Sequence, residues 1–190
     1  MKFRIKDLFH ELKHHFPFTF IATFLAILFS FLIKNFYSFS PEMFDYFHFI
    51  HIFFSSITSS AIFFKYKKNL FFALFVGVSS SLIFGTLSDI FFPFLSAFLF
   101  GFNPVFHLPL LENSFLVFFS SFLGALFGIL FRLTHLSHFL HVLISVFSST
   151  LYLFIFVSKI NLFFIFVSIP SIFFSVTFPC CVSDFFLKKK

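Results

Sequence analysis

The chain has few charged residues and lacks the motifs of several common enzyme classes. Only 11% of its 190 residues are charged, where a soluble domain carries about a quarter. Tryptophan is absent, and the two cysteines, Cys180 and Cys181, are adjacent, so they cannot build a disulfide framework. The chain has no His-Glu-x-x-His, Gly-x-Ser-x-Gly or phosphate-binding P-loop motif. These absences disfavour protease, esterase and nucleotide-driven pump chemistry.

The chain contains long runs of apolar residues. Hydrophobic residues make up 59% of the chain, and runs of about twenty apolar residues are typical of membrane-spanning helices. The runs do not alternate polar and apolar residues, which excludes an outer-membrane barrel. We therefore predict an all-α integral membrane protein with six transmembrane helices. The predicted spans are 16–33, 47–64, 70–93, 114–131, 138–157 and 162–186.

The positions of the basic residues predict the orientation of these spans. With six spans, Lys34 and Lys159 fall on one side of the membrane, and the other eleven Lys and Arg fall on the opposite side. Cytoplasmic loops carry the excess of Lys and Arg. We therefore expect both termini in the cytoplasm, in the inner membrane of a prokaryote. The net charge of +6 then reflects topology and contacts with anionic lipid rather than nucleic acid.

The sequence divides into two similar halves. The pair His48-x-x-His51 matches His138-x-x-His141 ninety residues later, and Ser88-Asp89 matches Ser183-Asp184 in the same order. Each half has three spans, so the halves lie in opposite orientations, as in many secondary transporters. Chance similarity between phenylalanine-rich helices is the alternative. The predicted divisions are an amphipathic cytoplasmic segment 1–15, a first repeat 16–93, an external loop 94–113, a second repeat 114–187 and a basic tail 188–190.

The ionisable residues near the ends of the spans are the predicted site. A charged residue inside a membrane is costly and by default suggests function, and histidines at i and i+3 share one helix face. We expect an outer cluster of His48, His51, Asp89 and Glu112, and an inner cluster of His14, His138, His141 and Asp184. The weaker candidates are His107, His15, Cys180, Cys181, Ser88 and Ser183. Imidazole, carboxylate and thiolate are ligands for Zn, Mn, Fe or Ni.

The small residues have a structural interpretation. Gly124 and Gly128 form a Gly-x-x-x-Gly pair, and Ser145 and Ser149 have the same spacing. Small residues at this spacing allow helices to pack closely in lipid. Pro93, within the third apolar run, is expected to kink or break its helix, which would free backbone carbonyls near the Ser-Asp pair.

The sequence thus favours a small membrane transporter, a carrier or channel-like protein, for a small cation such as a divalent metal. In this interpretation the metal is a substrate, the chain needs no resident cofactor, and no residue is assigned a catalytic role. Two alternatives stay open. One is a membrane-embedded enzyme or redox subunit that binds metal or haem, and the other is a structural subunit whose polar residues only pack. The sequence also leaves a homodimer open.

Overall fold

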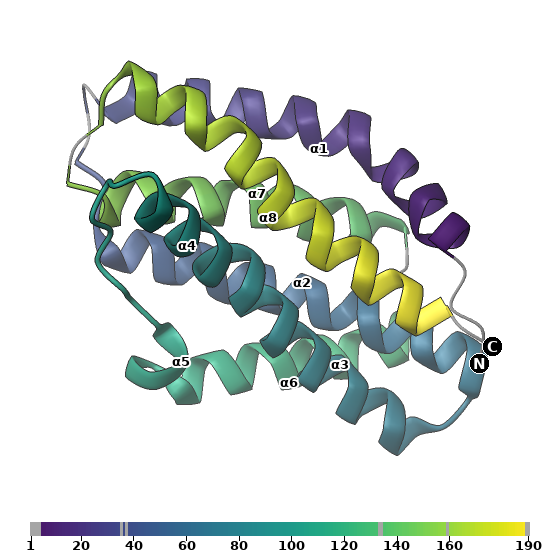
Figure 1. The fold of residues 1–190 in the computed structure, drawn as a ribbon. Coiled ribbons are helices and arrows are strands. Elements are labelled where there is room, and N and C mark those ends of the chain that lie inside the picture. Colours follow the sequence, from purple (N-terminus) through teal and green to yellow (C-terminus); the bar gives the residue numbers. More distant parts are fainter. Residues whose placement is uncertain (1–4, 35, 37, 133–134, 159, 189–190) are drawn as a thin grey trace.

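The chain is a bundle of long helices (Figure 1). In the computed structural model, the described residues are 5–34, 36, 38–132, 135–158 and 160–188. The helices are α1 (Ile5–Lys34), α2 (Pro41–Lys67), α3 (Leu70–Thr86), the π-helical turn η1 (Leu87–Phe91), α4 (Phe92–Leu99), α5 (Pro109–Glu112), α6 (Ser114–Phe131), α7 (His135–Phe156) and α8 (Leu162–Lys188).

Within the described residues, six helical segments are long and apolar enough to cross a membrane, which confirms the predicted all-α, six-span fold. The third crossing, Leu70–Leu99, combines α3, η1 and α4 and extends six residues beyond the predicted end at Pro93. Pro93 lies in the first turn of α4, directly after the π-helical turn η1. At the amino end, α1 is one continuous helix through Pro17, and its membrane-spanning segment begins at Phe16.

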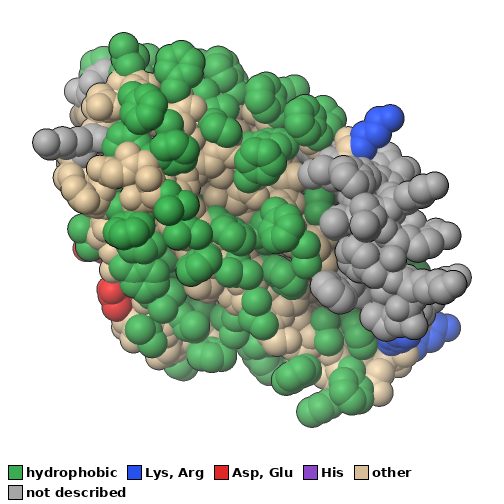
Figure 2. Space-filling model, in the orientation of Figure 1, with side chains coloured by type: hydrophobic (Ala, Val, Ile, Leu, Met, Phe, Trp, Pro, Cys, Tyr) green, Lys and Arg blue, Asp and Glu red, His purple; other side chains and the backbone are tan. Residues whose placement is uncertain are grey.

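Large apolar side chains cover the outside of the bundle. Phe71, Phe115 and Phe166 are each more than 70% exposed, and Figure 2 shows apolar side chains over most of the visible face. The Lys, Arg and acidic side chains that this view shows lie toward the two ends of the molecule. A soluble protein rarely exposes so wide an apolar surface, whereas a lipid bilayer covers one without cost.

The helices α2 and α7 occupy the centre of the bundle, and 61% of each membrane-spanning segment is buried. α1 packs against α7 and α8 on one side, and α6 packs against α2 and α3 on the other (Figure 1). Each half of the chain thus places its first span on the second and third spans of the other half. An inverted repeat would produce this exchange of contacts, and the repeat itself stays a prediction.

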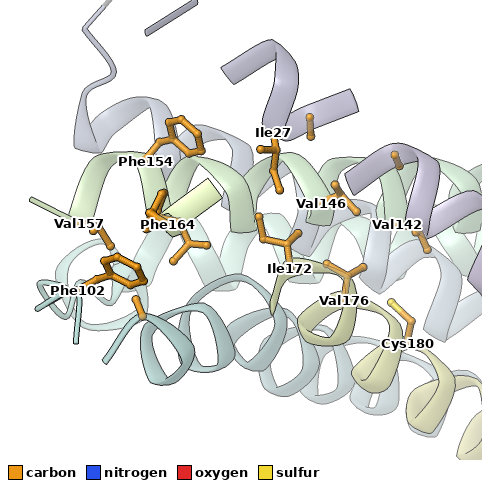
Figure 3. Close-up of a cluster of buried hydrophobic side chains, with 14 residues drawn as sticks. Ile27, Phe102, Val142, Val146, Phe154, Val157, Phe164, Ile172, Val176 and Cys180 are labelled. Carbon is orange, nitrogen blue, oxygen red and sulfur yellow. The ribbon is translucent and has the colours of Figure 1, made fainter. Parts of the chain in front are cut away.

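Glycines bring α6 close to α2. A methyl group on Gly124 would meet the carbonyl of Phe53, and one on Gly128 would meet the carbonyl of Ile57 and the hydroxyl of Ser60. The backbones of the two helices therefore approach more closely than any other residue type would allow. On the other side of the bundle, apolar residues of α1, α7 and α8 interlock, among them Ile27, Val146 and Ile172 (Figure 3).

Candidate metal centre

Two histidines of α2 face the interior of the bundle. His48 and His51 are 0% and 2% exposed, and they lie one helical turn apart, so both rings leave the same face of the helix. Because the close contact with α6 holds α2 in the middle of the bundle, these polar side chains are removed from lipid. A buried imidazole needs a polar partner.

That partner comes from the π-helical turn η1, which contains Ser88 and Asp89. Pro93 has no N–H to give to the carbonyl four residues earlier, at Asp89. The N–H of Phe92 bonds the carbonyl of Leu87, five residues back, and Ser149 of α7 donates to the carbonyl of Ser88 at 3.0 Å. The third span therefore bulges at Asp89, a local geometry that occurs frequently at functional sites.

The carboxylate of Asp89 contacts both histidines and two serines. One oxygen, Oδ2, lies 2.9 Å from Nδ1 of His48 and 2.7 Å from Nδ1 of His51. The other, Oδ1, accepts from Ser88 Oγ at 3.0 Å and from Ser145 Oγ at 2.9 Å. A carboxylate accepts and does not donate, so both Nδ1 atoms carry hydrogen in this arrangement. Four donors compensate a fully buried negative charge.

The same three residues fit a metal ion. His48, His51 and Asp89 each offer a ligand atom, and these atoms lie within 4.8 Å of one another. Tetrahedral zinc with bonds of about 2.05 Å holds its ligand atoms roughly 3.3 Å apart, so two ligand atoms 4.8 Å apart would have to approach each other by about 1.5 Å. Among the residues that the structure describes, three ligands meet here, and they leave one position open, unlike the closed four-ligand shell of a structural zinc site. We call His48, His51 and Asp89 the central site.

Glu112 does not join the central site, contrary to the grouping expected from the sequence. Its carboxylate lies 3.1 Å from Nδ1 of His107, and Nε2 of His107 lies 2.7 Å from Asp45. Asn113 donates to the other oxygen of Asp45 at 3.1 Å. The connection between α4 and α6 is thereby tied to the start of α2. We call Asp45, His107 and Glu112 the rim cluster.

One aromatic side chain lies between the rim cluster and the central site. Phe44 is fully buried, and its ring stacks on His48 with 5.7 Å between centroids. The ring of Phe44 also meets the ring of His107 edge to face, with 5.8 Å between centroids. Tyr152 and Phe156 of α7 pack on Phe44 at 5.3 and 5.6 Å. Phe44 therefore separates two groups of ionisable side chains with apolar carbon.

The structure describes the side chains of two residues of the predicted inner cluster, His138 and His141. His141 is buried and its ring is parallel to that of His51, with 5.9 Å between centroids. His138 meets His141 edge to face at 4.9 Å. His141 thus approaches the central site instead of forming a distant cluster. His14, His15 and Asp184 lie on helices, but their side chains fall outside the described part of the structure.

The remaining candidates, Cys180, Cys181 and Ser183, lie on α8. Cys180 Sγ is 3.4 Å from Nε2 of His141, and Cys181 is buried as well. Ser183 bonds Ser80 of α3 at 3.2 Å. A small pocket, which we call the polar pocket, has a volume of about 10 Å³. It is lined by His51, Ser55, Thr58, Ser59, Phe84, Ser88, His141, Pro179, Cys180 and Ser183.

Sequence reasoning missed several residues of these groups. Ser145 and Ser149 were assigned to helix packing, yet one bonds Asp89 and the other bonds the π turn. Their signal was present, since Ser145 follows His141 by four residues and shares its helix face. Asp45 precedes the predicted span 47–64, yet it lies on α2, three residues before His48. Phe44 carried no signal in a chain with 46 phenylalanines.

No family model, curated protein or solved structure matches this chain.

Proposed function

We propose that the protein is a membrane transporter, a carrier or channel-like protein, whose substrate is a divalent transition-metal ion. The observation that carries the proposal is the central site itself. Two imidazoles and a carboxylate meet with 0–2% exposure inside a bundle whose outer surface is apolar. Ionisable residues within membrane spans are rare, and they mark substrate and ion pathways and proton relays.

The chemistry of the central site suits a substrate ion better than a permanent one. A divalent cation beside the carboxylate of Asp89 leaves one net positive charge, with two neutral imidazoles completing the shell. The open fourth position admits water or an incoming ligand, so ligands can be exchanged one at a time. Zinc, iron, nickel and manganese all accept this donor set.

The surroundings of the central site outline a path. The rim cluster offers carboxylates at the end of the bundle that carries α5, opposite the amino end of α1 and the carboxyl end of α8 (Figure 1). Phe44 blocks the way from there to His48. On the other side of the central site, the polar pocket extends to Ser183. With both termini cytoplasmic, as the basic residues favour, the rim faces outward and the pocket leads inward.

Transport by the purified protein in liposomes tests the proposal. We expect saturable uptake of Zn²⁺ reported by an entrapped fluorescent indicator, and a loss of at least tenfold in initial rate for His51→Ala. Ile50→Ala, the neighbouring lipid-exposed position, is the matched control and should transport at the wild-type rate. Equal rates for His51→Ala and the wild type would overturn the proposal. So would the absence of uptake for each of Zn²⁺, Mn²⁺, Fe²⁺ and Ni²⁺.

Phe44→Ala should open the central site to the outer side. The reporter is Ser145→Cys in a chain with Cys180→Ser and Cys181→Ser, because Ser145 lies beyond Phe44 at Asp89. An impermeant cationic thiol reagent added outside intact cells should modify this cysteine at least tenfold faster when Phe44 is alanine, since the ring no longer fills the passage. Phe49→Ala, a second buried phenylalanine of α2, serves as control and should change little. Equal rates of cysteine modification in Phe44→Ala and Phe49→Ala would show that Phe44 is not the barrier. Faster modification only in inside-out vesicles would mean that the chain has the opposite orientation in the membrane.

A second candidate function has one observation in its favour. An apolar groove of about 470 Å³ lies between α4 and α8, lined by side chains that include Phe92, Leu95, Phe174 and Phe178. It borders the polar pocket along α8, because Phe178 is followed by the pocket residues Pro179 and Cys180. A membrane-embedded metal enzyme could place the chain of a lipid substrate here. Metal-dependent release of a lipid product in the same liposomes, without metal uptake, would favour this candidate over transport.

A further inference from the structure

We propose that His141 and Cys180 form a second metal station, one step inward from the central site, that selects ions with an affinity for sulfur. This proposal rests on the transport function, because it describes where the ion goes after it leaves Asp89. It gives the chain a nitrogen–sulfur site in addition to the nitrogen–oxygen one. Figure 3 places Cys180 at the end of the apolar cluster, next to Val142 and Val176.

The spacing of the two ligand atoms carries the proposal. Cys180 Sγ and His141 Nε2 are 3.4 Å apart, and the residues are 7% and 6% exposed. Zinc binds thiolate at about 2.3 Å and imidazole at about 2.05 Å, so a tetrahedral angle sets these atoms roughly 3.6 Å apart. The pair therefore has the separation of two ligands on one ion before any ion arrives.

The neighbourhood of the pair supplies room and further oxygen ligands. Cys180 and His141 both line the polar pocket, whose volume of about 10 Å³ is close to the minimum for one water molecule. Ser55, Thr58 and Ser59, each with a hydroxyl group, line the same space. Pro179 cannot donate to the carbonyl of Ser175, four residues earlier, which loosens α8 next to the pocket. An ion here would keep one water or hydroxyl ligand.

His51 connects the two stations. Its Nδ1 contacts Asp89 at 2.7 Å, while its ring lies parallel to that of His141 at 13°. His51 also lines the pocket with His141 and Cys180. An ion held by the central site can therefore gain His141 while it still binds His51, and then exchange Asp89 for Cys180. The thiol releases its proton to water in the pocket when it binds the ion.

This second station gives the path a preference among metals. Thiolate is a soft ligand and favours zinc and iron, whereas manganese and magnesium prefer oxygen ligands. The central site alone, with two imidazoles and a carboxylate, accepts manganese as well. Passage through Cys180 would therefore discriminate against hard ions after the first binding step.

Cobalt spectroscopy of the full-length protein in detergent tests the second station. Co²⁺ substitutes for zinc and shows a near-ultraviolet charge-transfer band only when a thiolate binds it. We expect this band in the wild type, its loss in Cys180→Ser, and its retention in Cys181→Ser, the adjacent buried cysteine. His141→Gln, which leaves both cysteines in place, should weaken the band at least tenfold at equal Co²⁺, so the test does not depend on a single variant.

The outcomes separate this proposal from the proposed function. Co²⁺ binding that depends on Asp89 but shows no thiolate band in the wild type would overturn the second station and leave the central site standing. Absence of any Co²⁺ binding would overturn both. A band that persists in Cys180→Ser and disappears in Cys181→Ser would also overturn the assignment.

Discussion

Asp89→Asn should lower the affinity for Zn²⁺ at least a hundredfold, or about 2.7 kcal/mol. Asparagine has nearly the same shape, and its oxygen can still accept from Ser88 and Ser145. It carries no charge, however, and its amide nitrogen would face the ring nitrogens of His48 and His51, where Oδ2 now accepts. Competition with a chromophoric zinc chelator, on purified protein in detergent, measures this affinity.

A second carboxylate offers the matched control. Asp45 is also paired with a histidine, His107 at 2.7 Å, but it belongs to the rim cluster. Asp45→Asn should therefore keep the wild-type zinc affinity within about threefold, which corresponds to less than 1 kcal/mol. If Asp89→Asn bound zinc as tightly as the wild type, the central site would not be a metal site.

The same titration has an expected dependence on pH. Metal ligation requires imidazole without its second proton and carboxylate without any, so protons compete with the ion. Affinity should therefore decrease as the pH is lowered, because added protons compete with the ion for the same ligand atoms. Zinc binding that did not change between pH 7 and pH 5 would contradict ligation by His48 and His51.

Gly128→Val should cause the largest loss of stability of any single change proposed for this chain. The added carbons would meet the carbonyl of Ile57 and the hydroxyl of Ser60 across the contact between α6 and α2. Overpacking commonly costs about 1–3 kcal/mol, and here the obstacle is backbone, which cannot rotate away. We expect the melting temperature in detergent, followed by far-ultraviolet circular dichroism, to fall by more than about 5 °C.

Leu130→Val is the control for this change, since Leu130 lies two residues along α6 and is 71% exposed toward lipid. It should leave the melting temperature within about 2 °C, as expected for a surface substitution. Gly128→Val should also alter the geometry of the central site, because α2 carries His48 and His51. A Gly128→Val protein as stable as Leu130→Val would show that the close contact of α2 and α6 does not stabilise the bundle.

The sequence predicted the parts of this protein that depend on a single helix. Apolar runs of about twenty residues predicted six spans, because a bilayer requires that length in any fold. The pair His48 and His51 could be assigned to one helix face from spacing alone, and Pro93 indicated disturbed backbone beside Asp89. The glycines of α6 were assigned to helix packing, and they do contact α2.

The sequence could not predict which spans meet, because nearly every helix here is apolar on several faces and a phenylalanine-rich surface fits many partners. Glu112 and Asp89 both fell at the outer end of a span, yet only Asp89 reaches the histidines of α2. His141 was expected in a separate inner cluster and instead stacks on His51, since α2 and α7 cross at the centre of the bundle.

What the sequence determined by itself is therefore the membrane class, the number of spans and the residue types available for a site. Only the tertiary structure decided that His48, His51 and Asp89 share one buried centre, that Ser145 supports it and that Phe44 closes one side of it. The reason is physical. Spacing along one helix is a local property, whereas contacts between helices depend on close packing, on the glycines of α6 and on the bulge at η1.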